Sequence, residues 1–108
     1  MDNSKIRVTT CPTSLKLLAD FWSLRIIESL MQGEQRYCEL QRGVGNLNPA
    51  TLTTKLADLE AANIIVRSAE VGGHTVHYEL SPLGLNAIPV LEAIKSFSQK
   101  YQEANRNN

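Results

Sequence analysis

Residues 47–65 carry the strongest structural signal in the chain, because both the start and the period of a helix can be read there. Asn48 is a favoured N-cap residue, and Pro49 follows at the first helical position, where a missing N–H costs nothing. Asn63 is a candidate C-terminal cap before a β-branched run. Three leucines recur at helical spacing on one face: Leu52, Leu56 and Leu59.

The opposite face of this helix is unusual for a solvated surface, which is normally rich in Glu and Lys. Its first two turns offer small or hydroxylated side chains, with Lys55 on the flank. Such a slim polar face can enter the major groove of DNA, and an ordinary surface helix is the alternative. The predicted DNA-facing residues are Asn48, Pro49, Ala50, Thr51, Thr54 and Lys55.

The segments around this helix predict a mainly α fold with a small antiparallel β-hairpin. Two helices, one opening at Pro12 and one from Phe21 to about Gln32, come first, and the second is apolar enough to be the buried centre. An extended piece at 35–37 and a short helix at 37–44 precede residue 47. Strands at 64–69 and 75–80 then flank Gly72-Gly73. Helix, turn, helix and hairpin follow in the order of a winged helix-turn-helix.

A final helix is predicted from Pro82 to about Gln102, kinked by Pro89 in its interior. Its apolar stripe exceeds what a domain of this size can cover, so we expect it to mediate dimerisation. The expected organisation is a flexible arm at 1–10, one winged domain at 11–102 and a disordered tail at 103–108.

Composition excludes several classes of protein. The 108 residues suit one domain, and neither a signal peptide nor an apolar run of roughly 18 residues is present, so we expect a cytoplasmic protein without a membrane partner. Two cysteines without paired histidines favour neither a disulfide nor zinc. We find no catalytic constellation, and we expect no enzyme, cofactor or metal. The 11 basic and 11 acidic residues balance, which counts against a nucleic-acid binder unless the charge is distributed unevenly.

Short motifs in order along residues 11–98 make the chain resemble the HxlR-type winged helix-turn-helix transcription regulators, relatives of the MarR group. They include Cys11-Pro12, Trp22 before an Ile-rich helix, Arg36-Tyr37-Cys38-Glu39-Leu40, Lys55-Leu56, Val76-His77-Tyr78-Glu79-Leu80-Ser81 and Pro89-Val90-Leu91. The chain departs from the family's Gly-Gly-Lys-Trp step, where it has Ala19-Asp20-Phe21-Trp22. Its wing tip, Val71-Gly72-Gly73-His74, contains fewer Arg and Pro residues than that of many members of the family. Both departures reduce positive charge.

The resemblance implies a homodimer built from the first and last helices, which binds a near-palindromic double-stranded DNA operator. Repression is the favoured mode of regulation. The alternative is a winged-helix protein-interaction module that does not bind DNA, which the zero net charge and Asp20 support. A thiol enzyme is a third class, but no base or resolving thiol is evident near Cys11. The residues expected at the dimer seam are Leu15, Leu18, Leu91, Ile94, Phe97 and Tyr101.

The resemblance also implies roles for residues outside the central helix. Arg36 and Arg42 are candidates for contacts with the phosphate backbone of DNA. Arg67, His74 and Thr75 of the wing are candidates for contacts with a minor groove or its phosphates. His77 is expected to be partly buried and structural. A cysteine at the position of Cys11 senses quinones, aldehydes or oxidants in several resembling regulators, so a small electrophile is a candidate effector. A helix N-terminus stabilises a thiolate, although such a thiol can also be inert.

Three further side chains have structural interpretations. Cys38 is interpreted as a small core residue. Phe21 and Trp22 could line a pocket for an aromatic effector near the dimer seam, but packing in the core is favoured for both.

Overall fold

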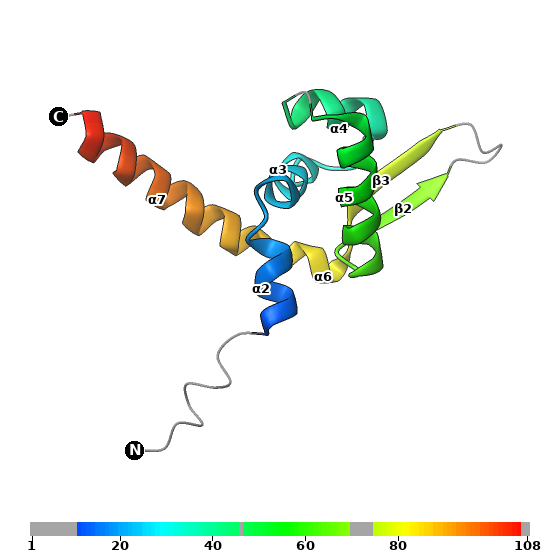
Figure 1. Ribbon diagram of the computed structural model, residues 1–108, viewed down its shortest axis with the longest axis horizontal. Coiled ribbons are helices and arrows are strands. Elements are labelled where there is room, and N and C mark those ends of the chain that lie inside the picture. The colour runs from blue at the N-terminus through cyan, green and yellow to red at the C-terminus, as the bar shows by residue number, and fades with distance from the viewer. Residues whose placement is uncertain (1–10, 46, 70–74, 107–108) are drawn as a thin grey trace, which may run out of the picture.

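The computed structural model describes residues 11–45, 47–69 and 75–106, and these form a mainly helical fold with a small antiparallel sheet (Figure 1). The predicted arm at 1–10, His74 with the rest of the wing tip, and residues 107–108 lie outside the described residues. The elements are α2 (Pro12–Leu18), α3 (Phe21–Leu30), β1 (Gln35–Arg36), α4 (Tyr37–Gly43), α5 (Pro49–Ala61), β2 (Ile65–Ala69), β3 (Val76–Leu80), α6 (Pro82–Leu85) and α7 (Ile88–Arg106).

Helix α5 begins and ends as the sequence predicts. Asn48 Oδ1 accepts hydrogen bonds from the backbone N–H groups of Ala50 and Thr51, at 2.8 and 3.4 Å. At the other end Asn63 adopts a left-handed φ of 68°, and the next N–H donates to the Leu59 carbonyl at 2.9 Å. All three leucines of the predicted stripe are buried, so this helix is confirmed.

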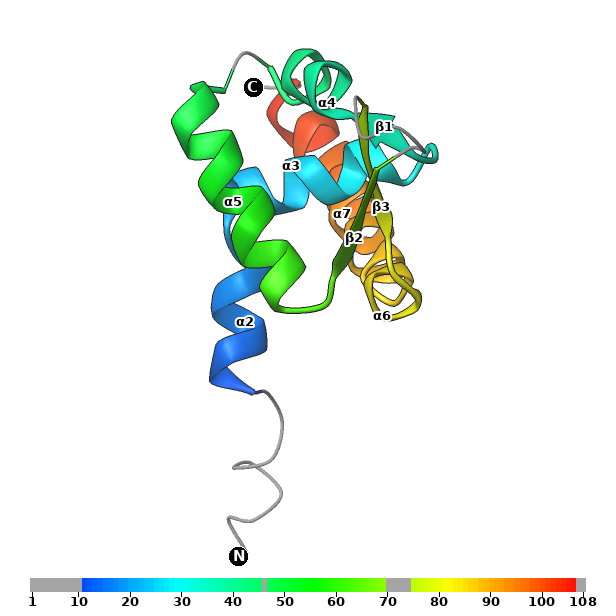
Figure 2. The ribbon, with the colours of Figure 1, turned by 90° about the vertical axis from the view of Figure 1, so that its right-hand side faces the viewer.

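The core lies around α3, which sits between α5 and the sheet and also contacts α7 (Figure 2). Ile26 and Ile27 of α3 are fully buried. They pack in one cluster with side chains of α4, α5 and the sheet, which include Leu40, Leu52, Leu59, Ile65 and Leu80. The expectation that the second helix forms the centre of the domain is therefore confirmed.

The sheet has three strands in the order β1-β3-β2, so the predicted β-hairpin is only part of it. β2 and β3 pair antiparallel, with Ile65 opposite Leu80. On the other edge of β3, Gln35 lies opposite Tyr78 and Arg36 opposite His77. A strand of two residues has no readable period, which is why the sequence indicated only an extended piece there.

The predicted single helix from residue 82 to 102 is wrong, because the chain breaks into α6 and α7 at Asn86 and Ala87. Pro89 explains the break, since it has no N–H to donate to the Leu85 carbonyl and its ring would clash with that carbonyl. The Ala87 N–H instead donates to the Gly84 carbonyl at 2.9 Å, three residues back. The tail prediction also fails in part, because residues 103–106 continue α7.

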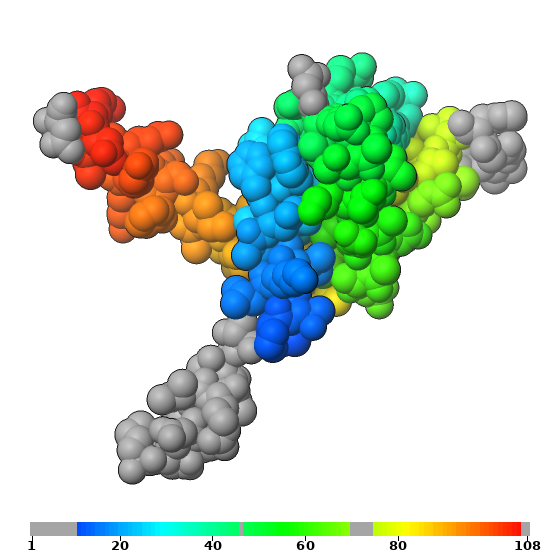
Figure 3. Space-filling view, in the orientation of Figure 1, coloured from blue at the N-terminus to red at the C-terminus, as the bar shows by residue number. Residues whose placement is uncertain are grey.

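Helix α7 extends away from the body of the molecule (Figures 1 and 3). None of its 19 residues is buried within this one chain. In the described part of the chain, no helix combines the length and apolar character that crossing a membrane requires.

Candidate nucleic-acid interface

Helices α4 and α5 form a helix-turn-helix in which a tyrosine of α4 is hydrogen-bonded to α5. The Tyr37 hydroxyl donates to the Pro49 carbonyl at 3.1 Å and lies 3.3 Å from Thr53 Oγ1. The Gln41 side chain donates to the carbonyl of Leu47, which is itself buried in the core. The first turn of α5 is therefore held in one orientation relative to α4. Sequence reasoning missed this role of Tyr37, because nothing local connects positions 12 and 16 residues apart.

The outward face of α5 is open to solvent and consists of small side chains over its first turns (Figure 3). Ala50 and Thr54 are exposed as predicted, and the Thr54 hydroxyl donates to the Ala50 carbonyl at 3.0 Å. Thr51 is half-buried on the flank of the helix. Thr53 and Ala57 are exposed on the outward side and were not predicted to face DNA.

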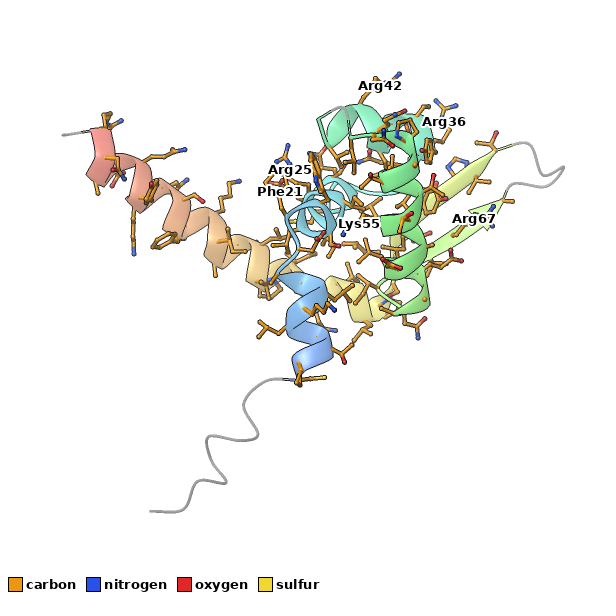
Figure 4. All side chains as sticks on the ribbon, in the orientation of Figure 1. Phe21, Arg25, Arg36, Arg42, Lys55 and Arg67 are labelled. Atoms are coloured by element: carbon orange, nitrogen blue, oxygen red, sulfur yellow. The ribbon has the colours of Figure 1, made fainter. Side chains whose placement is uncertain are left out.

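Lys55 lies on the flank of α5, as expected, but its side chain pairs with Asp20 instead of joining the predicted DNA-facing set. Its Nζ lies 3.0 Å from Asp20 Oδ1, and the two side chains are only 26% and 31% exposed. The lysine lies toward the start of α3 (Figure 4). The reason is geometric, since position 55 follows Thr51 by one turn on the flank that faces α3.

Asp20 is both the partner of Lys55 and the N-cap of α3. Its carboxylate accepts a hydrogen bond from the Ser23 N–H at 2.9 Å. Burial works to raise the pKa of Asp20, but the hydrogen bonds from Lys55 and Ser23 outweigh it and hold the pKa below its ordinary value. The acidic departure from the family's motif therefore has a structural role within the chain.

The arginines predicted to contact DNA lie on neighbouring elements, near the start of α5 and on its sheet side (Figure 4). Arg36 lies in β1 at the N-cap of α4, Arg42 lies near the end of α4, and Arg67 is exposed on β2. The Arg36 N–H donates to the Glu39 carboxylate at 2.8 Å and the Arg36 guanidinium lies 3.8 Å away, which together keep the pKa of Glu39 low. Arg36 thus has its charge partly compensated.

Thr75 and His77 lie at the base of the wing. Thr75 is half-buried, and His77 is part of β3. The His77 side chain is 19% exposed and its Nδ1 lies 3.6 Å from a Glu34 carboxylate oxygen. The partly buried position expected for His77 is therefore confirmed.

Cys11 is exposed at the N-cap of α2, where it is a free thiol. The Cys11 side chain makes no capping hydrogen bond to the backbone of α2. The backbone N–H and hydroxyl of Ser14 and the N–H of Thr13 nevertheless lower the pKa of Cys11. The core interpretation of Cys38 is wrong, since Cys38 is also exposed. It precedes the buried Leu40 by two positions, about 200° around the helix.

The predicted seam residues divide into two groups. Leu15, Ile94, Phe97 and Tyr101 are exposed, Phe97 by 66%. Leu18 and Leu91 are partly buried and pack against the core of their own chain. Trp22 packs there as favoured, but core packing is wrong for Phe21, which is 63% exposed and borders a groove between α3 and α7 with Leu91 and Ile94.

Within the described residues, no three His, Cys, Asp or Glu side chains gather where they could hold a metal ion.

Comparison with known proteins matches residues 17–106 to the HxlR-like helix-turn-helix family. An uncharacterized HTH-type transcriptional regulator of Methanothermobacter thermautotrophicus is 28% identical over 89 residues, which are 81% of this chain and 67% of that protein. A MarR-family transcriptional regulator from Porphyromonas gingivalis W83 superposes with a TM-score of 0.74 at 30% identity, covering 82% of this chain and 90% of the other. The reduced form of the transcriptional regulator YodB from B. subtilis gives 0.75 at 25% identity, covering 89% and 98%.

Proposed function

The chain belongs to the HxlR-like helix-turn-helix family, and we propose that it is a transcription regulator that binds operator DNA as a homodimer. It acts as a repressor in the cytoplasm. The observation that carries this proposal is the outward face of the first half of α5. Its side chains are small and exposed, and Tyr37 fixes the helix against α4. A helix held in this way can enter a major groove with its N-terminal residues against the base edges.

The zero net charge of the chain is compatible with this function because the charges are distributed unevenly. Arg36, Arg42 and Arg67 flank the N-terminal half of α5 and the adjacent strand, where the phosphates of a bound duplex would lie. Asp58 and Glu60 occupy the last turns of α5. We therefore expect the helix to approach DNA by its N-terminal half.

A second copy of this chain supplies the other half of the operator-binding unit. Large apolar side chains of α7 and α2 are exposed in this chain, with Phe97 66% and Tyr101 60% exposed, and a second copy would cover them. Their burial in a two-fold seam would place two α5 helices about 34 Å apart, in successive major grooves.

Cys11 is the candidate sensor of an electrophilic effector. It is accessible and its pKa is lowered, which favours the reactive thiolate. The similar regulator YodB has been solved in a quinone-bound form. A Cys11→Ser protein should bind DNA but ignore a quinone, and Cys38→Ser, which removes the other exposed thiol, is the matched control. Equal release of all three proteins from DNA by the quinone would refute the role of Cys11.

The function is tested by measuring binding to fragments of the upstream region of the gene at increasing salt concentration. We expect a clear preference over random duplex, and we expect the logarithm of the affinity to fall linearly with the logarithm of the salt concentration. Arg42→Gln and Arg67→Gln should each reduce the salt slope by about 2, because each substitution removes one phosphate contact from both subunits of the homodimer. Arg106→Gln, which removes the same charge from the far end of α7, should not change it. Salt-independent binding to a protein, with no retention of DNA, would instead support the protein-interaction module.

A further inference from the structure

The hydroxyl groups on the outward face of α5 are already engaged within the protein. Thr54 donates its proton to the Ala50 carbonyl. Tyr37 uses its single proton on the Pro49 carbonyl, so the Thr53 hydroxyl supplies the proton of their mutual bond. Neither threonine therefore has a hydroxyl proton left for the acceptors N7 and O6 of guanine, N7 of adenine or O4 of thymine.

The longer polar side chains at the start of α5 are engaged as well. Adenine is read by an amide that both donates and accepts, but Asn48 Oδ1 already accepts two backbone N–H groups. Guanine is read by a cation, but Lys55 is paired with Asp20 on the flank. The charged side chains of α5 that are exposed, Asp58 and Glu60, are both acidic and lie beyond the N-terminal half.

Methyl groups are what this face still offers to a base. They come from Ala50, Thr53, Thr54 and Ala57, which are all exposed on the first three turns. In the major groove, the apolar group that identifies a base is the C5 methyl of thymine. We propose that α5 reads its half-site mainly through thymine methyl groups, with Thr54 as a specificity-determining residue. This inference rests on the proposed function and specifies the class of operator that it recognises.

The proposal is tested with modified bases in the preferred duplex, which is first selected with the full-length protein from a random pool. Each thymidine of a half-site is replaced in turn by deoxyuridine, which removes the methyl group and leaves base pairing unchanged. We expect binding to weaken about fourfold at each contacted thymine. Replacing guanines by 7-deazaguanine, which lacks the N7 acceptor, should leave the affinity within the half-site unchanged.

Two substitutions of Thr54 separate its methyl group from its hydroxyl. Thr54→Val keeps a methyl group, so this variant should still bind the deoxyuridine duplex more weakly than the thymidine duplex. Thr54→Ser keeps the hydroxyl that bonds to Ala50 and should lose the deoxyuridine effect at one thymine of the half-site. Both variants preserve the buried face of α5, so thermal unfolding should show them to be folded.

The outcomes distinguish the proposal from the function on which it rests. A duplex that is still preferred, but is insensitive to deoxyuridine at every position, overturns methyl readout and leaves the regulator function intact. Sensitivity to 7-deazaguanine without sensitivity to deoxyuridine also overturns it. If no duplex is preferred over the random pool, both the function and the inference are refuted.

Discussion

The ion pair between Lys55 and Asp20 should stabilise the contact between α5 and α3 by a measurable coupling free energy. Exposed pairs contribute about 0–1 kcal/mol, whereas losing one partner of a fully buried pair costs about 3–5 kcal/mol. With side chains 26% and 31% exposed and Nζ 3.0 Å from Oδ1, this pair lies toward the exposed end of that range. We expect a coupling of about 1 kcal/mol.

The substitutions Asp20→Asn and Lys55→Met isolate this coupling. Asparagine remains a good N-cap for α3, and methionine keeps the apolar stem that packs on the flank of α5. Each single variant should lose about 1 kcal/mol of unfolding free energy, and the double variant should lose little more. Asp20→Ala, which also removes the cap at Ser23, should lose about 2 kcal/mol in total.

Urea unfolding at pH 7 and at one fixed protein concentration measures all four variants, because the stability of the proposed dimer would depend on protein concentration. Thermal unfolding checks the same order, with about 4–8 °C of Tm for each kcal/mol in a domain of this size. Additive single losses, within about 0.3 kcal/mol, would show that the two charges do not interact in solution. That result would release Lys55 for contact with DNA.

Four further outcomes follow from the geometry. The pKa of Asp20 is lower in the folded than in the unfolded state, so its carboxylate stabilises the fold above the unfolded pKa of about 4. This stabilisation is lost as the pH falls through the folded pKa, and the stabilities of wild type and Asp20→Asn should therefore converge when unfolding is measured in acid. Gly84→Ala should cost about 1–3 kcal/mol in urea unfolding, since its Cβ would lie 2.1 Å from the Ile64 carbonyl oxygen; an unchanged midpoint would mean that α6 shifts freely. Tyr37→Phe should cost about 1 kcal/mol by the same measurement, through its two hydrogen bonds to α5, and no loss would show that solvent replaces them. Phe97→Asp should yield monomers in light scattering, and persistent dimers would place the seam elsewhere.

Local signals predicted the central helix well, because its determinants lie within a few residues of one another. Asn48, Pro49 and the three leucines specify a start, a direction and a buried face without reference to the rest of the chain. The left-handed Asn63 is equally local. The helix cap at Asp20 is also local, because its carboxylate accepts a hydrogen bond from the N–H three residues further on.

Features that depend on pairing between distant segments could not be read from the sequence. Lys55 and Asp20 are 35 positions apart, and no local pattern shows which lysine will meet which carboxylate. The pairing of Gln35 with Tyr78 depends likewise on how the sheet closes. Pro89 was recognised as a perturbation, but whether it bends a helix or ends it depends on how the flanking segments pack, which only the fold determines.

The short strand β1 has a mechanical consequence for regulation. It leads directly into α4 and is hydrogen-bonded to β3, so the start of the helix-turn-helix and the base of the wing share one continuous backbone framework. Tyr37 extends this framework to α5. Within one subunit, the groove-reading and wing segments should therefore move as a single rigid body. In the proposed dimer, an effector would therefore change DNA affinity by altering the angle between two such bodies. Intramolecular distances among the DNA-facing elements should then be the same in the bound and released states.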